Sequence, residues 1–289
     1  MEPVEAGALV CFRSAPPSLS APAHREVGGR RFLSLSQVVR VIARLGHMTN
    51  NQANPYGNPE KPQRPSLGSG ISPNVSQLER AQLAQLLLEK GPDAPTLCDG
   101  WNTRDMVTHL VVRENRPDAA AGMFVPFLGD HLDKVSKEVA EQPYEQLVEK
   151  FRQGPPAWNP MRLGDKYINA SENFIHHEDV RRGGGDTTPR NLPESVERQL
   201  WKITTQAARL MVRPDNVHVI LQPEFPSSAS TPTGGPEVFR IGNTAAAEVK
   251  ICGKPSEILL WVFGRGKAAH LTVEESQPDA KERIELKSL

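Results

Sequence analysis

With 289 residues, of which 38% are hydrophobic, the chain is long enough for about two globular domains, each with its own core. Lys+Arg and Asp+Glu both number 34, so no excess of positive charge favours phosphate binding, and we expect no nucleic-acid partner. Three widely separated cysteines argue against a disulfide framework or a zinc knuckle, and no run reaches the roughly 18 apolar residues of a membrane span, so we expect a cytoplasmic protein without a membrane partner.

The first part of the chain, residues 1–70, has the composition of a disordered tail. It combines Pro-rich pieces with a GGRR turn and an Asn/Gln patch, and only FLSLSQVVRVIARLG is weakly apolar. Such a segment cannot bury enough apolar surface to offset the entropy lost on ordering. The alternatives are a non-native extension, with Met48 as a plausible true start, or an organellar transit peptide, which has a similar excess of arginine.

The folded part is expected to begin at ISPN with an amphipathic helix. Ser72 is suited to cap this helix, and Gly91 is suited to end it. At helical spacing, Val75, Leu78 and Leu86 share one face. The sequence therefore predicts a helix with that face towards a core.

A second helix is predicted in WNTRDMVTHLVVREN. Thr103 can cap it, and Asp105 lies in the first turn, where the helix dipole favours a negative charge. His109 falls on an inward stripe with Met106, Leu110 and Arg113. A hydrogen-bonded core histidine and a functional group are both open interpretations of His109, and its partners must decide between them.

Further helices are predicted before residue 214. The segment HLDKVSKEVAEQPYEQLVEKFRQG predicts one interrupted or two short helices, with Pro143 at a first turn. RLGDKYINASENFIHHEDVRRGGG predicts a long helix that stops at residues 183–185, and after Pro193 apolar residues recur at spacings of three and four. Four main helices joined by variable loops predict a four-helix bundle over residues 71–213.

From Pro214 onwards the pattern changes to short strands. HVILQPEF, EVFRIG, AAEVKICG and AAHLTVEE predict strands, and PSEILLWVFGRG predicts a helix that begins at Pro255 and ends at Gly264. Residues 226–236 read as a loop between strands. We therefore expect an α domain followed by an α+β domain over residues 214–289, with the boundary near residues 211–216.

The segment SENFIHHEDVRR carries the chemistry-bearing cluster. Glu172 and His176 are four residues apart, so both can reach one metal ion, and His109 is the best third ligand from another helix. An ordinary solvated pair at the same spacing is the alternative. Next to them, His177 projects roughly 100° away and is expected to be a surface or interhelix residue.

The charged end of this helix is expected to be structural. Glu178, Asp179, Arg181 and Arg182 predict helix-end salt bridges, although Asp179 is also suited to accept a hydrogen bond from a ligand imidazole. The zincin motif HExxH, the nucleophile motif GxSxG and a Gly-rich phosphate loop are all absent from the sequence.

Two blocks resemble a known family. LCDGWNTRDMVTHLVVRENRPDAA and NASENFIHHEDVRR resemble the actinobacterial mycothiol-dependent maleylpyruvate isomerase family, and PSEILLWVFGRGKAAHLTVE resembles its small C-terminal domain. The resemblance covers residues 72–275 and implies a DinB-like four-helix bundle. It also implies a divalent metal ion, typically zinc, bound by His109, Glu172 and His176.

The same resemblance implies thiol chemistry. A metal ion with one open position would lower the pKa of the thiol of mycothiol, and the thiolate would add to an electrophilic small molecule, as in an isomerase or an S-transferase. Cys98 and Cys252 are then structural, and we expect a monomer or homodimer. A non-catalytic metal-binding or small-molecule-binding module is the alternative. Arg113 either meets an anionic group or extends to the edge of the bundle.

Overall fold

The computed structural model describes residues 75–123, 125–157, 159, 168–225 and 237–287. Within these residues the chain is mixed α and β, with eight α-helices and two small sheets. The helices are α2 (Val75–Lys90), α3 (Thr103–Asn115), α4 (Pro117–Ala120), α5 (Gly129–Ala140), α6 (Tyr144–Gln153), α7 (Ile168–Arg182), α8 (Glu194–Met211) and α9 (Pro255–Val262). The tail predicted for residues 1–70 and the predicted cap Ser72 lie outside the described residues.

Four strands form the main sheet in the order β3-β2-β4-β5. They are β2 (Val217–Pro223), β3 (Phe239–Gly242), β4 (Ala247–Gly253) and β5 (Thr272–Glu275). β2 pairs with β4 in parallel, while β3 and β5 pair at the two edges in antiparallel fashion. The four predicted strands are thus confirmed.

A second, two-stranded sheet was not predicted. It pairs β1 (Val212–Pro214) with β6 (Ile284–Leu286) in antiparallel fashion. Each strand has only three residues, too few for an alternating pattern to be recognised. The pairing places the end of the described chain beside the end of α8, where the Lys287 N–H donates to the Met211 carbonyl at 2.8 Å.

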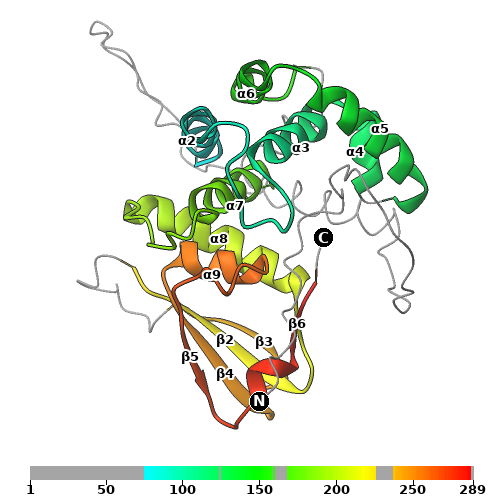
Figure 1. The fold of residues 1–289 in the computed structure, drawn as a ribbon. Helices are drawn as coiled ribbons and strands as arrows, with labels where there is room; N and C mark the ends of the chain where they lie inside the picture. Colours follow the sequence, from blue (N-terminus) through cyan, green and yellow to red (C-terminus); the bar gives the residue numbers. More distant parts are fainter. Residues whose placement is uncertain (1–74, 124, 158, 160–167, 226–236, 288–289) are drawn as a thin grey trace, which may run out of the picture.

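The helices and the main sheet form layers, with α7 in the middle (Figure 1). The helices α2, α3, α5 and α6 lie on one side of α7, and α8 and α9 lie between α7 and the sheet. The buried apolar residues fall into two clusters. One joins α2, α3, α5 and α6, and the other joins α7 and α8 to α9 and the sheet. The helix α7 therefore faces both cores.

Two helix ends follow the expected turn chemistry, with one correction. Gly91 ends α2 with a φ of 74°, a conformation that glycine adopts at no steric cost. The cap of α3 is Asn102 rather than Thr103, because the Asn102 side chain accepts the Asp105 N–H while the Asp105 carboxylate accepts the Asn102 N–H. Thr103 instead donates its hydroxyl hydrogen to the Gly91 carbonyl.

The inward face of α2 also differs from the prediction. Leu78 and Leu86 are only half-buried, whereas the polar residues Glu79 and Arg80 are buried together with Val75. A buried Glu114 on α3 accepts two hydrogen bonds of 2.6 Å from the Arg80 guanidinium. The prediction chose the wrong stripe: Leu83 and Leu87 are the buried leucines, and the paired charges beside them made their face look less apolar than it is.

None of the helices in the described residues is long and apolar enough to cross a bilayer. The division of the chain into domains at residue 214 stays a prediction.

Candidate metal centre

The helices α3 and α7 bring the three predicted ligands together. His109 on α3 and Glu172 and His176 on α7 each offer a donor atom, and the three donor atoms lie within 4.8 Å of one another. All three side chains are buried, with exposed fractions of 4%, 7% and 3%. The cluster therefore matches the set that helical spacing and an inward-facing histidine predicted.

Aromatic packing and short polar contacts fix the cluster. The His109 ring lies 5.3 Å from the Trp101 ring and 5.4 Å from the His176 ring, measured between centroids. His176 Nε2 lies 3.3 Å from Glu172 Oε2, one helical turn away. Donors around one zinc ion are about 3.4 Å apart, because each bond is about 2.0–2.1 Å long. A small contraction of the observed cluster would satisfy that spacing.

The charge states of His109 and Glu172 suit a cation. Burial and then the charge of His176 lower the pKa of His109 to about 3, so this imidazole is neutral at pH 7. Burial opposes ionisation of Glu172, but the charge of Arg113 and the hydrogen bond from His176 outweigh it and lower the pKa of Glu172 to about 2. Burial opposes protonation of His176, but its hydrogen bonds to Asp179 and Glu172 outweigh this and raise its pKa, so a bound cation would have to displace a proton from Nε2. Two imidazoles and one carboxylate form a donor set typical of catalytic zinc, with one position left open.

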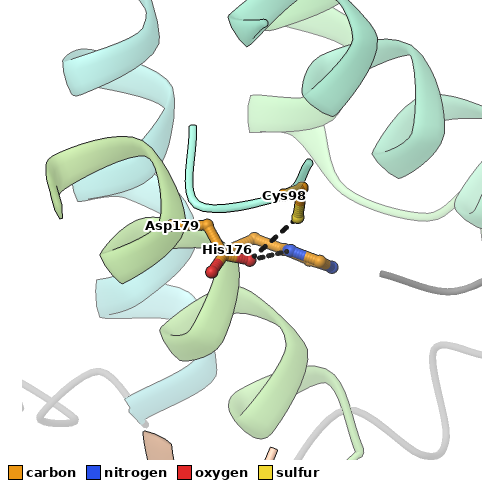
Figure 2. Close-up of side chains that lie close together, drawn as sticks. All are labelled: Cys98, His176 and Asp179. Atoms are coloured by element: carbon orange, nitrogen blue, oxygen red, sulfur yellow. Dashed lines mark hydrogen bonds and ion pairs between the residues drawn. The ribbon is translucent and has the colours of Figure 1, made fainter. Parts of the chain in front are cut away.

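A carboxylate behind the cluster orients His176. Asp179 Oδ2 lies 3.0 Å from His176 Nδ1 and accepts its hydrogen, which leaves Nε2 facing Glu172 (Figure 2). Burial opposes ionisation of Asp179, but the charge of Arg265 outweighs it and keeps the pKa of Asp179 low. Asp179 therefore takes both of its predicted roles: it accepts a hydrogen bond from His176, and it forms a salt bridge, although with Arg265 rather than with an arginine at the end of its own helix.

A second group of donors overlaps the first. Cys98 Sγ, His176 and Asp179 also converge, with Sγ 3.4 Å from Asp179 Oδ2 (Figure 2). The guanidinium of Arg265 already contacts both Asp179 oxygens and lies 3.7 Å from Cys98 Sγ. Because a positive charge occupies this space, a metal ion is better placed among the first group.

The other face of α7 holds a buried ionic network. His177 Nδ1 lies 2.7 Å from Glu79 Oε2 on α2, so His177 is an interhelix residue, one of its two predicted roles. Glu178 pairs with Arg181 and Arg182 on its own helix, as predicted, and also with Arg190 at 2.6 Å. These pairs are buried rather than exposed at a helix end.

Two arginines in the site region have roles that the sequence left open or did not show. Arg113 is 9% exposed and lies against the cluster, with Nε 3.7 Å from Glu172 Oε2 and Nη1 donating to Asn169, so it does not extend to the edge of the bundle. The sequence assigns no role to Arg265. Its pairing with Asp179 joins segments 86 residues apart, and no local pattern could reveal it.

Cys252 does not have the properties of a nucleophile. Cys252 on β4 is buried, and burial raises the pKa of its thiol, so little thiolate is present at neutral pH.

Comparison with known proteins finds similarity to solved structures alone. No family model matches the chain, and no curated protein matches it. Two solved structures do, those of the mycothiol-dependent maleylpyruvate isomerase and of a mutant of that enzyme, each at 18% identity over 69% of this chain and 90% of theirs. The TM-scores are 0.36 and 0.37. At this level of similarity the case for function rests on the side chains described above.

Proposed function

We propose that the protein binds one divalent metal ion, zinc by preference, through His109, Glu172 and His176. The observation that carries this proposal is the convergence of two imidazoles and an ionised carboxylate, all buried, from two helices. Buried groups of this kind are costly unless they are paired or bind a metal. The resemblance of the two sequence blocks to the isomerase family points to the same three residues.

The activity we propose is the addition of a low-molecular-weight thiol, mycothiol in the first instance, to an electrophilic small molecule. A divalent ion at this centre would supply Lewis acidity that lowers the pKa of a thiol at the open position. A bond then forms between the thiol sulfur and an electrophilic carbon, and a proton is taken up elsewhere on the substrate. Retention of this bond is a transferase reaction, and its later cleavage after rotation is an isomerase reaction.

The residues of the chain have separate tasks in this proposal. His109 remains neutral because of its burial, and Arg113 keeps Glu172 ionised, so both are ready to bind a cation. Asp179 holds the hydrogen of His176 at Nδ1 and directs Nε2 towards the other donors. The Trp101 ring packs against that of His109, with 5.3 Å between the ring centroids, and helps to hold it in place.

The fold proposed for this function is a DinB-like four-helix bundle over residues 71–213, followed by an α+β domain over residues 214–289. The layered arrangement, with the donor helices α3 and α7 above α8, α9 and the sheet, is compatible with that division (Figure 1).

Cobalt substitution tests the proposed activity on the full chain. Co²⁺ in a site of nitrogen and oxygen donors gives visible bands, and coordination of a thiolate adds a charge-transfer band in the near ultraviolet. We expect mycothiol to produce that band in the parent and not in His109→Ala. A thiol-dependent change of an added electrophile should follow in the parent only.

A non-catalytic binding module of the same fold is the second candidate. It predicts the visible cobalt bands without a thiolate band and without turnover of any electrophile. That outcome would contradict the thiol chemistry and leave the metal centre in place.

A further inference from the structure

A side chain from the C-terminal part of the chain contacts the metal-centre helix. Arg265 lies in the turn after α9, and its guanidinium meets both oxygens of Asp179: Nε is 3.0 Å from Oδ1, and Nη2 is 2.8 Å from Oδ2. Arg265 is 4% exposed and Asp179 is fully buried. Two parallel N–H···O bonds fix the plane of a carboxylate as well as its position. Asp179 is therefore held in one orientation.

The orientation of Asp179 sets that of His176. Asp179 Oδ2 is the atom that accepts from His176 Nδ1 at 3.0 Å, and the same oxygen accepts from Arg265. With one hydrogen held at Nδ1, the imidazole directs Nε2 towards Glu172, 3.3 Å away, and a bound cation would take the place of the proton between these two atoms. A ligand imidazole needs this tautomer and this direction, and the group behind it supplies both.

The sequence FGRG explains how Arg265 reaches α7. Gly264 has a φ of 81°, which turns the chain back at the end of α9, and the Arg265 N–H closes the turn by donating to the Leu260 carbonyl at 2.8 Å. Gly266 packs against Trp261, where an added Cβ would come within 2.9 Å of the indole ring. Both glycines thus help to place the arginine between them.

The geometry points to Arg265 as a positioning residue of the metal centre: it holds Asp179, and Asp179 holds His176 as a ligand. This inference rests on the proposed metal site. Arg265 also lines a surface pocket of about 280 Å³ together with Arg182 and Lys267. Its guanidinium is nevertheless committed to the interior, because Nε and Nη2 donate to Asp179 and Nη1 donates to the Phe263 carbonyl at 2.6 Å.

Zinc affinity of the full chain tests the inference, measured by competition with a chromophoric chelator. Arg265→Met should weaken zinc binding about tenfold, at the lower end of the 10–100-fold loss typical of groups behind a ligand, because it acts through Asp179. Asp179→Asn should weaken binding by at least as much. The double variant should bind zinc no more weakly than Asp179→Asn alone, because both changes interrupt one chain of contacts.

Arg190→Met is the matched control. It removes a guanidinium that is held by Glu178 on α7 at 2.6 Å and by Glu79 on α2 at 3.0 Å, on the face of α7 away from the donors. Its zinc affinity should stay within about twofold of the parent. The visible spectrum of bound Co²⁺ provides a second readout, which should change in Arg265→Met and remain that of the parent in Arg190→Met.

The outcomes separate the inference from the proposal on which it rests. A parent that binds no zinc overturns both. A parent that binds zinc with the same affinity as Arg265→Met overturns the inference alone, as do losses that add in the double variant. If Arg265→Met does not fold, the double variant, which lacks both buried charges, is compared with Asp179→Asn instead. A zinc affinity of the double variant well below that of Asp179→Asn overturns the inference.

Discussion

Replacement of Arg182 by Met should cost more stability than any other single loss of charge on α7. Arg182 is 1% exposed, and its guanidinium donates to Glu257 on α9 at 2.7 and 3.0 Å, to Glu178 at 2.5 Å and to the Ala268 carbonyl. Without it, Glu178 keeps Arg181 and Arg190, but among the described residues Glu257 keeps only the His270 N–H at 2.9 Å. The variant therefore leaves one buried carboxylate without its cation.

Breaking a buried ion pair by removing one partner costs about 3–5 kcal/mol. For a chain of this size that corresponds to a fall in Tm of roughly 6–20 °C, at about 2–4 °C per kcal/mol. Urea unfolding of the parent and Arg182→Met measures the loss. The exposed pair of Arg198 and Glu194 on α8 is the control, and Arg198→Met should change stability by at most about 1 kcal/mol.

A double-mutant cycle tests the reason for this loss. Because Arg182→Met leaves Glu257 charged and unpaired, adding Glu257→Gln should recover part of the stability, with a coupling of about 0.5–3 kcal/mol. A loss under about 1 kcal/mol in Arg182→Met, or single losses that simply add, would refute the argument that Glu257 depends on this arginine.

Three further predictions concern the glycine turn, acid and metal. Gly264→Ala should lower the free energy of unfolding by about 1–2 kcal/mol through the φ of 81° alone, because nothing lies near an added Cβ. Gly184→Ala has equal space and no positive φ, so it should be nearly neutral in the same unfolding assay. Burial opposes ionisation of Glu178, but its arginines outweigh this and hold its folded pKa below 4.5. The contribution of ionised Glu178 to the free energy of unfolding is therefore present above pH 4.5 and lost as pH falls through the folded pKa. The difference in stability between the parent and Glu178→Gln should shrink below pH 4.5. Zinc at 100 times its Kd should stabilise the parent by about 2.7 kcal/mol. In a thermal scan the Tm of His176→Ala should stay almost unchanged. An equal rise in the Tm of both proteins would contradict the ligand role of His176.

The donors were predictable because they follow helical geometry. Glu172 and His176 share a face at a spacing of four, and His109 lies on the buried stripe of α3, so local periodicity indicated each side chain, whereas the family resemblance selected the three as one set and the tertiary structure shows that they converge. The helix ends at Gly91 and at residues 183–185 were predictable for the same reason, since glycine there ends the pattern.

The surroundings of the donors were not predictable from local patterns. The buried faces of α2 and α7 carry paired charges beside their apolar residues, and partners of these charges come from distant segments such as Arg190 and Glu257. Apolar periodicity does not identify the positions on a buried face that ion pairs occupy. The contact of Arg265 with Asp179 depends on how α9 packs under α7, which only the tertiary structure shows.

Zinc stoichiometry of the full chain tests the metal centre most directly. The parent, His176→Gln and His177→Gln are each incubated with zinc, freed of excess and measured by elemental analysis. His177 is the matched control, since it is the adjacent buried histidine but faces Glu79 rather than the donors. We expect close to one zinc ion per chain in the parent and in His177→Gln, and loss of it in His176→Gln. No zinc in the parent, or equal zinc in all three proteins, would contradict a metal centre formed by His109, Glu172 and His176.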